Sequence, residues 1–341
     1  MLITLKKQLP PADISSLMEQ LKKKGLTSLL SWNDKQQPLL TVAAQNTGSK
    51  ELAYWQQLPN VVKASPITRE YILAGRQPNE QRLIIKCRKQ SIGGKKLTII
   101  AGPCAVESKS QIMDSARQVK AAGASMLRGG LFKPRSSPYA FQGLGETGLH
   151  YLHQAAREHN LLSVCEVMDT SQIDCMAQYI DILQVGARNM QNFSLLKKLG
   201  RVNNPILLKR AMSATYQEFL LAAEYIMQAG NTQVILCERG IRSFETHTRN
   251  TLDLAAVPAL QTLSRLPVIV DPSHGVGVRQ WVEPMCYAAI AAGCDGLIIE
   301  AHPQPDTALS DAKQTITPET LQTIIKKGDQ LARLFNRHLQ D

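Results

Sequence analysis

The strongest constraint on the fold is a series of eight short apolar segments between residues 97 and 300, separated by segments with helical periodicity. Nearly continuous apolar runs of this length are typical of parallel strands covered on both faces. The predicted strands are Leu97–Ala101, Met126–Arg128, Leu162–Glu166, Ile180–Val185, Ile206–Lys209, Val234–Cys237, Val268–Asp271 and Gly296–Glu300. Helical patterns between them include Ser110–Ala122, Tyr216–Gln228 and Glu283–Ala292. Eight strand–helix repeats over about 240 residues favour an α/β fold closed into a (β/α)8 TIM barrel.

An open, doubly wound α/β sheet is the competing fold. Such a sheet favours a glycine-rich dinucleotide fingerprint directly after its first strand. The first predicted strand instead runs into the segment AGPCAVES, and the chain contains neither a P-loop motif nor a Gly-x-Ser-x-Gly nucleophile motif. The lack of these signatures favours the closed barrel.

The chain has 341 residues, which suits one large barrel with a small additional module. Residues 1–66 follow the order β-α-β-β-α-β, the order of a small ferredoxin-like α+β domain. Its predicted elements are the strands Met1–Leu5, Leu26–Trp32, Leu39–Ala44 and Val61–Ala64 and the helices Asp13–Lys24 and Glu51–Leu58. Residues 67–96 are predicted to be a linker and a hairpin, in which Leu83–Lys86 and Leu97–Ile100 flank a turn at Gly93-Gly94. Residues 97–341 are predicted to form the barrel.

The net charge of +11 has three competing explanations: a nucleic acid, a membrane surface or small anionic substrates. Nucleic-acid binding favours clustered Lys and Arg with interleaved aromatic residues. Aromatic residues make up only 5% of this chain, and the dense run Lys22-Lys23-Lys24 ends a predicted helix, where the helix dipole favours cations. The charge therefore points to small anions, with no nucleic-acid partner.

The seven cysteines are irregularly spaced and form no Cys-x-x-Cys pair, which argues against a disulfide framework. The segment MLITLKKQLPPADI has too short an apolar run for a signal peptide. No apolar stretch reaches the 18 residues that would indicate a membrane span. We therefore expect a cytoplasmic protein without a membrane partner.

Charged residues are concentrated where the predicted strands end, the position at which barrel enzymes place their active sites. Cations follow strands two, four, five and six of the predicted barrel. These cations are Arg128, Lys133, Arg135, Arg188, Lys209, Arg210 and Arg239. A rim salt bridge is an adequate explanation for any one of them. Cations converging on one mouth would repel each other without an anion, so we expect a substrate carrying phosphate and carboxylate groups.

A second set of strand-end residues predicts a metal site. Cys104, His274, Glu300 and Asp311 follow strands one, seven and eight, which are neighbours in a closed barrel. Thiolate, imidazole and carboxylate groups together suit Zn²⁺, Mn²⁺ or Fe²⁺. Spacing alone does not decide the matter, since Cys104 read singly is a buried apolar residue and His274 a loop histidine. We expect Asp271 to be a capping or supporting group.

Seven segments resemble the signature segments of 3-deoxy-D-arabino-heptulosonate 7-phosphate (DAHP) synthases. The closest resemblance is to the type I branch with an N-terminal ferredoxin-like domain. The segments are AGPCAVES, LRGGLFKPRSSPYAFQGLG, QVGARNMQNF, LLKR, ILCERGIRSFE, VDPSHGVG and IIEAHPQPDTALSD. They occur in order, and the resemblance covers nearly the whole chain. The resemblance implies condensation of phosphoenolpyruvate with D-erythrose 4-phosphate and water to give DAHP and phosphate, the first step of the shikimate pathway to aromatic amino acids.

The resemblance also implies roles for individual residues. The family's metal ligands fall on Cys104, His274, Glu300 and Asp311, which would hold one divalent ion: Mn, Fe, Zn or Co. Its phosphoenolpyruvate contacts fall on Arg128, Lys133, Arg188, Lys209 and Arg239. Its erythrose 4-phosphate contacts fall on the segment Lys133-Pro134-Arg135-Ser136, with Arg135 as the main phosphate partner. Lys133 is the first candidate for proton transfer. Glu166 is a candidate for positioning water, with an ion pair to a neighbouring arginine as the alternative.

We expect a homo-oligomer, with a tetramer as the expected state. Similar family members use the small domain to bind an aromatic amino acid that inhibits the barrel. The nearest alternative function is 3-deoxy-D-manno-octulosonate 8-phosphate synthase, in which the segment after strand two resembles PANRTS. The corresponding segment KPRSS favours the four-carbon aldose. A binding or regulatory protein without catalysis is the alternative from another class, and the complete set of ligand and cation positions argues against it.

Overall fold

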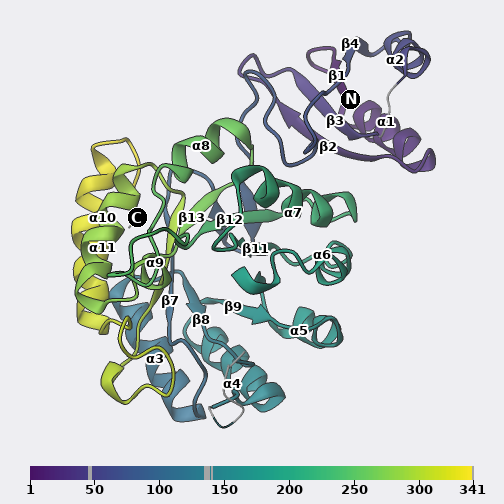
Figure 1. The fold of residues 1–341 in the computed structure, drawn as a ribbon. Helices are drawn as coiled ribbons and strands as arrows, with labels where there is room; N and C mark the ends of the chain where they lie inside the picture. Colours follow the sequence, from purple (N-terminus) through teal and green to yellow (C-terminus); the bar gives the residue numbers. More distant parts are fainter. Residues whose placement is uncertain (45–47, 134–138, 140, 340–341) are drawn as a thin grey trace.

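The structure, a computed structural model, describes residues 1–44, 48–133, 139 and 141–339. Its larger part is a closed barrel of eight strands in the order β10-β11-β12-β13-β14-β7-β8-β9 (Figure 1), and neighbouring strands in it pair in parallel. The strands are β7 (Thr98–Gly102), β8 (Met126–Arg128), β9 (Leu162–Val167), β10 (Ile182–Val185), β11 (Ile206–Lys209), β12 (Val234–Glu238), β13 (Val268–Val270) and β14 (Gly296–Glu300). The predicted fold class is confirmed, with strand boundaries within two residues of those expected.

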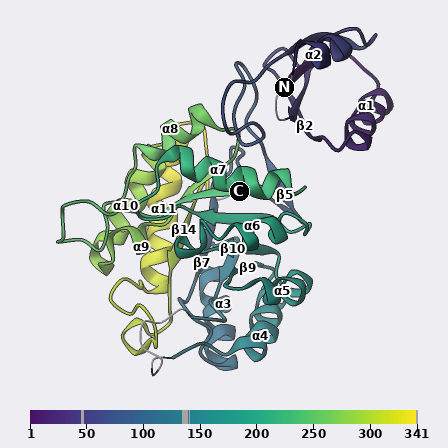
Figure 2. The ribbon, with the colours of Figure 1, turned by 45° about the vertical axis from the view of Figure 1, so that its right-hand side comes forward.

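Helices surround the barrel, as Figure 2 shows from a second direction. They are α3 (Lys109–Ala122), α4 (Gly145–Glu158), α5 (Ile173–Tyr179), α6 (Phe193–Leu199), α7 (Tyr216–Gln228), α8 (Ala256–Leu263), α9 (Pro272–Val276), α10 (Arg279–Ala291) and α11 (Pro318–Arg333), with short 3-10 turns η1 (Thr170–Gln172), η2 (Ala187–Asn189) and η3 (Pro305–Thr307). The predicted start of α10 at Glu283 is wrong. The helix begins at Arg279 and continues through Pro284, which lies within the second turn. In the described part of the chain, no helix combines the length and apolar character needed to cross a membrane.

The first part of the chain forms the small domain, coloured purple in Figure 1. Its elements are β1 (Leu2–Leu5), α1 (Pro11–Lys23), β2 (Thr27–Trp32), β3 (Pro38–Ala43), α2 (Ser49–Gln56) and β4 (Val61–Ser65). The strands pair antiparallel in the order β2-β3-β1-β4, which is the ferredoxin-like topology expected from the sequence. A separate apolar core, which includes Ile3, Leu21, Leu40 and Trp55, lies between the sheet and its helices.

The hairpin before the barrel differs from the prediction. Its strands are β5 (Ile85–Cys87) and β6 (Gln90–Ile92), and its turn lies at Arg88-Lys89, where Arg88 takes a φ of 50°. In the predicted segment Leu97–Ile100, the residues from Thr98 onward instead belong to the barrel strand β7, which pairs with β8 and β14. Hairpin residues Ile85, Cys87 and Ile92 pack in one apolar cluster with the inward-facing side chains of the barrel. The hairpin thus covers the end of the barrel at which the strands begin.

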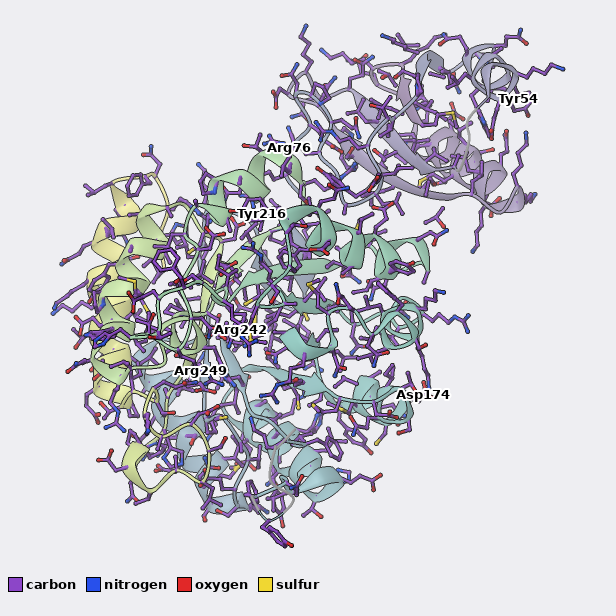
Figure 3. The ribbon with its side chains drawn as sticks, in the orientation of Figure 1. Tyr54, Arg76, Asp174, Tyr216, Arg242 and Arg249 are labelled. Atoms are coloured by element: carbon purple, nitrogen blue, oxygen red, sulfur yellow. The ribbon has the colours of Figure 1, made fainter. Side chains whose placement is uncertain are left out.

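Arg265, on the loop before β13, links the connecting segment and the small domain to the barrel. Its guanidinium is fully buried, donates to the Gly75 carbonyl oxygen and to Thr41 Oγ1 on β3, and pairs with Glu80 at 2.6 Å. Arg76, labelled in Figure 3, lies where this segment passes α8 and donates to the Gln261 carbonyl oxygen. The small domain is therefore anchored at the end of the barrel opposite the carboxyl ends of the strands.

Candidate active site at the barrel mouth

The two-residue period of the strands determines which side chains reach the barrel axis. The inner apolar layer includes Ile100, Met126, Val164, Ile182, Leu207, Cys237, Ile269 and Ile298. Two residues further along each strand, the same face carries Gly102, Arg128, Glu166, Gln184, Lys209, Arg239, Asp271 and Glu300. The barrel interior therefore changes within one layer from wholly apolar to almost wholly polar. At Gly102, φ is +150° and a Cβ would lie 2.3 Å from the Arg128 carbonyl oxygen, so glycine leaves room at this crowded position.

The same period turns Arg210 and Glu238 away from the axis. Arg210 Nη1 donates to Glu238 Oε2 at 2.9 Å and to Asp253 Oδ2 at 2.8 Å, and its guanidinium lies 4.6 Å from the centre of the Tyr216 ring. Tyr216, labelled in Figure 3, donates its hydroxyl to the same Asp253 oxygen. Arg210, one of the predicted strand-end cations, is therefore a structural partner that joins the loops after β11 and β12.

The polar layer opens into a cavity of about 140 Å³ at the carboxyl ends of the strands. Its lining brings together eight of the predicted site residues: Arg128, Lys133, Glu166, Arg188, Lys209, Arg239, His274 and Asp311. Arg128, Lys209 and Arg239 are each at most 6% exposed. Within the described residues, Arg128 Nη1 is buried without a hydrogen-bond partner. A buried donor of this kind has a strong requirement for an acceptor, so an anion fits the cavity.

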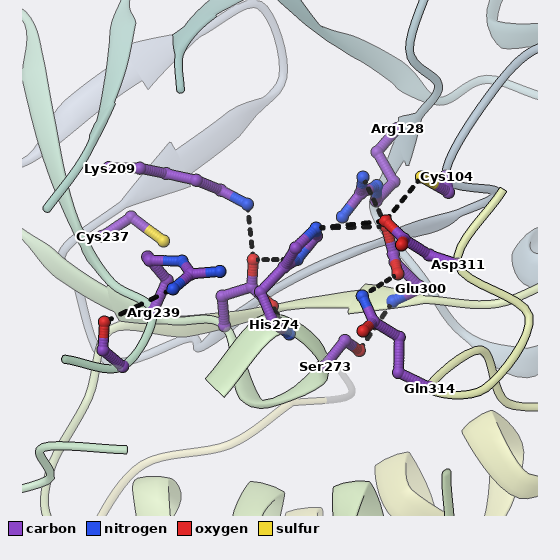
Figure 4. A network of polar contacts seen from close by, with 12 residues as sticks. Cys104, Arg128, Lys209, Cys237, Arg239, Ser273, His274, Glu300, Asp311 and Gln314 are labelled. Carbon is purple, nitrogen blue, oxygen red and sulfur yellow. Dashed lines mark hydrogen bonds and ion pairs between the residues drawn. The ribbon is translucent and has the colours of Figure 1, made fainter. Parts of the chain in front are cut away.

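The predicted metal ligands converge at one side of this cavity (Figure 4). Donor atoms of Cys104, Glu300 and Asp311 all lie within 4.8 Å of one another. His274 Nε2 lies 3.4 Å from Glu300 Oε1 and 3.9 Å from Asp311 Oδ2, so the imidazole faces the same point. Soft thiolate, neutral imidazole and carboxylates form a donor set that can hold a divalent transition metal.

His274 is oriented by the residue that precedes its helix. Asp271 caps α9 by accepting from the His274 backbone N–H, and its Oδ2 accepts from ring Nδ1 at 2.8 Å, so Nε2 is left unprotonated toward the cluster. Burial lowers the pKa of His274 despite Asp271, which favours the neutral ring that binds metals. Lys209 Nζ donates to the same carboxylate, as Figure 4 shows. The expected supporting role of Asp271 agrees with this geometry.

Lys133 connects the cation-lined cavity with the donor cluster. Its Nζ donates to Cys104 Sγ at 2.9 Å and to the Cys104 carbonyl oxygen at 3.0 Å. Arg128 Nη2 lies 3.1 Å from Glu300 Oε1 and makes a second connection. Burial and the nearby Glu300 raise the pKa of the Cys104 thiol to about 12, with Lys133 opposing them. A bound cation would stabilise the thiolate that this environment otherwise disfavours.

Glu166 lies over a glycine at the cavity wall. Its Oε2 accepts from Gln184 Nε2 at 3.4 Å, and a Cβ on Gly186 would lie 1.9 Å from Oε1. The glycine thereby leaves space for the carboxylate. Gln184 itself was not predicted, although the two-residue period of β10 places it on the inner face.

Sequence reasoning missed further residues around the cavity. Met212 and Arg249 line it, and Gln314 donates a hydrogen bond to Glu300 of the donor cluster. These three lie in loops after strands, where no periodic pattern indicates the direction of a side chain. Two predicted residues, Arg135 and Ser136, lie outside the described residues.

The fold and the site define a barrel enzyme that acts on small anionic substrates beside a group of side chains able to hold a metal ion. The family model described as "DAHP synthetase I family" matches residues 79–337, and the chain belongs to that family. Its activity is accordingly the condensation step of aromatic biosynthesis.

Relatives agree with this assignment. The phospho-2-dehydro-3-deoxyheptonate aldolase of Thermotoga maritima is 46% identical over 278 residues, which are 82% of each chain. A crystal structure of the Thermotoga maritima DAHP synthase is 40% identical, covers 99% of this chain and 98% of that one, and superposes with a TM-score of 0.77. The 2-dehydro-3-deoxyphosphooctonate aldolase of Syntrophotalea carbinolica is more distant, at 29% identity over 69% of this chain and 90% of its own. The alternative eight-carbon product is therefore disfavoured.

Proposed function

We propose that the barrel mouth condenses phosphoenolpyruvate with D-erythrose 4-phosphate beside one divalent metal ion held by Cys104, His274, Glu300 and Asp311. The observation that carries this proposal is that one cavity adjoins both the buried cations, which require an anion, and the donor cluster. The donor set suits Mn²⁺, Fe²⁺, Zn²⁺ and Co²⁺ alike, so it leaves the identity of the ion open. Bound there, the ion would supply Lewis acidity to the aldehyde oxygen.

The cations would bind and orient the enolpyruvyl phosphate. The assigned contacts are Arg128, Lys133, Arg188, Lys209 and Arg239. Because Arg128 is held by Glu300 and Lys209 by Asp271, their charges are already in position when the substrate arrives. Arg135 and Ser136 would contact the phosphate of erythrose 4-phosphate, following the resemblance of their segment to the family.

In the reaction, water attacks C2 of phosphoenolpyruvate, C3 attacks the aldehyde carbon, and the phosphate leaves from C2. Lys133 is the candidate for proton transfer, since its ammonium lies between the cation-lined cavity and the donor cluster. Glu166 would orient the water, a role that its place in the cavity wall over Gly186 supports. An ion pair with a neighbouring arginine is the competing role for Glu166.

Phosphate release from phosphoenolpyruvate tests the proposal. Release should require erythrose 4-phosphate, should be much slower with a five-carbon aldose phosphate, and should stop after chelation with EDTA and return with Mn²⁺. Full activity in protein shown to be free of metal would contradict the metal assignment. Equal rates with the five-carbon sugar would contradict the substrate assignment.

We further propose that the small domain makes the enzyme feedback-regulated, binding an aromatic amino acid at an interface with a barrel of a cytoplasmic homo-tetramer. Every assigned catalytic residue lies between Cys104 and Asp311, and the small domain is anchored at the opposite end of the barrel through Arg265. Regulation would require an inhibited arrangement favoured by the effector, with a coupling of about 1–3 kcal/mol. A purely structural domain is the competing reading. Steady-state rates with tyrosine, phenylalanine and tryptophan, together with light scattering, test the effector and the oligomer.

A further inference from the structure

The amide of Gln314 links the Glu300 carboxylate to the Arg249 guanidinium, and the proposed function assigns Gln314 no role. Gln314 lies between η3 and α11, shortly after Asp311, and is 3% exposed. Its Nε2 donates to Glu300 Oε2 at 2.6 Å, a bond visible in Figure 4, and its Oε1 accepts from Arg249 Nη1 at 2.9 Å. The side chain therefore bridges a buried carboxylate and a guanidinium at the cavity rim.

An amide is the side-chain group that satisfies both neighbours. A carboxylate only accepts hydrogen bonds and a guanidinium only donates them, so the group between them must do both. Glutamate at this position would oppose the carboxylate of Glu300 at hydrogen-bond distance. Methionine, with a similar volume, would leave Glu300 Oε2 without this donor in a buried place.

The hydrogen bond from Gln314 determines which carboxylate oxygen of Glu300 faces the donor cluster. With Oε2 engaged by Gln314, Oε1 is the oxygen that lies 3.1 Å from Arg128 Nη2 and 3.4 Å from His274 Nε2. The backbone N–H of Glu300 donates to Ser273 Oγ at 3.0 Å, which fixes the other end of the residue. Glu300 is thus held both at its carboxylate and at its backbone.

Arg249 is held from two directions as well. Its backbone N–H donates to the Val276 carbonyl oxygen, and a Cβ on Gly277 would lie 2.5 Å from Arg249 Cβ, so the residue rests directly on the loop that follows His274. Its Nη1 lies 3.7 Å from Asp311 Oδ1. The cation, labelled in Figure 3, is therefore kept at the cavity beside two candidate metal ligands.

We propose that Gln314 is a positioning residue that fixes the Glu300 carboxylate for metal binding and holds Arg249 at the cavity rim. The inference rests on the metal site proposed above. Partners that hydrogen-bond to ligating carboxylates set ligand orientation, and their loss typically weakens metal binding about 10- to 100-fold. We expect Gln314→Glu and Gln314→Met to weaken binding within that range.

The experiment titrates Co²⁺ into metal-stripped, full-length protein and follows the thiolate-to-cobalt absorption band together with the dissociation constant. Gln118→Glu is the matched control, since Gln118 donates to the Asp114 carboxylate at 2.8 Å on the outer helix α3. That variant should bind Co²⁺ as the unaltered protein does, and the melting temperatures of the metal-free Gln314→Met and unaltered proteins should agree within a few degrees.

Co²⁺ affinity and absorption unchanged in Gln314→Met would overturn the inference while leaving the metal site intact. Failure of the unaltered protein to bind Co²⁺, with Cys104→Ser behaving identically, would instead remove the proposed metal site and the inference with it. If Gln314→Glu does not fold, Gln314→Met, which adds no charge, decides the question.

Discussion

Replacing Arg210 by methionine tests whether the outward-facing ion pair with Glu238 holds the ends of β11 and β12, where Lys209 and Arg239 lie. Arg210 has a side-chain exposure of 6% and Glu238 of 0%, so the pair is removed from water. The substitution deletes the bonds to Glu238, to Asp253 and to the Ala214 carbonyl oxygen, along with the contact over Tyr216. Methionine keeps much of the apolar volume, so the loss is mainly electrostatic.

The loss of stability arises from the Glu238 carboxylate, which stays buried without its cationic partner. Breaking a buried pair by removing one partner destabilises a protein by about 3–5 kcal/mol, since the remaining charge is uncompensated. Two features favour the lower end of that range. Glu238 Oε1 still accepts from the Gly240 N–H, and Asp253, with 16% side-chain exposure, keeps its bond from Tyr216. We therefore expect a loss of about 3 kcal/mol.

Urea unfolding followed by circular dichroism measures the free energy of unfolding. The double variant Arg210→Met/Glu238→Gln serves as the control, because a neutral amide has no charge to compensate, and it should recover at least about 1 kcal/mol. The Michaelis constant for phosphoenolpyruvate should rise in the single variant, since Lys209 and Arg239 adjoin the altered residues. A loss below about 1 kcal/mol with unchanged kinetics would refute the reasoning.

Three other perturbations address the site and the small domain. Cys104→Ser should lose bound metal and most turnover, measured by metal analysis and phosphate release, while circular dichroism stays unchanged; retention of both would exclude the thiol from the site. Gly186→Ala should lower kcat at least about tenfold, because the new Cβ displaces the Glu166 carboxylate by more than 1 Å; a normal kcat would mean that the position of Glu166 is unimportant. A chain beginning at Ile67, which keeps the buried residues Leu73 and Ala74 on the barrel, should remain active and lose its response to tyrosine or phenylalanine. Inhibition as strong as in the full chain would contradict the regulatory role, whereas insolubility would favour a structural one.

The strands, and the convergence of most of the candidate site residues, were predictable because they follow from short-range periodicity. Apolar runs marked the strands, and polar residues directly after them marked the mouth. The two-residue period, applied strictly, also predicts that Lys209 and Arg239 face the barrel axis, whereas Arg210 and Glu238 face away from it. Inspection of strand ends alone did not make this distinction.

Other features depend on contacts that no local pattern encodes. Gln314 and Arg249 reach the site from irregular loops, and their direction is set by Glu300 and by the loop at Gly277. The hairpin was misplaced because the pair Gly93-Gly94 resembles a turn, whereas the chain turns at Arg88-Lys89 and uses the glycines to enter the barrel. Tertiary packing of Ile85 and Ile92 under the barrel decided that arrangement.

The hairpin covers the end of the barrel at which the strands begin, and this affects how ligands can enter the barrel. With that end filled by apolar side chains, the described residues leave the mouth as the entrance to the cavity. In a cavity that is open at one end, a ligand bound at the base must bind before a ligand bound nearer the entrance. Arg128, Lys209 and Arg239 are each at most 6% exposed, so under the proposed assignment phosphoenolpyruvate would bind at the base of the cavity before the aldose.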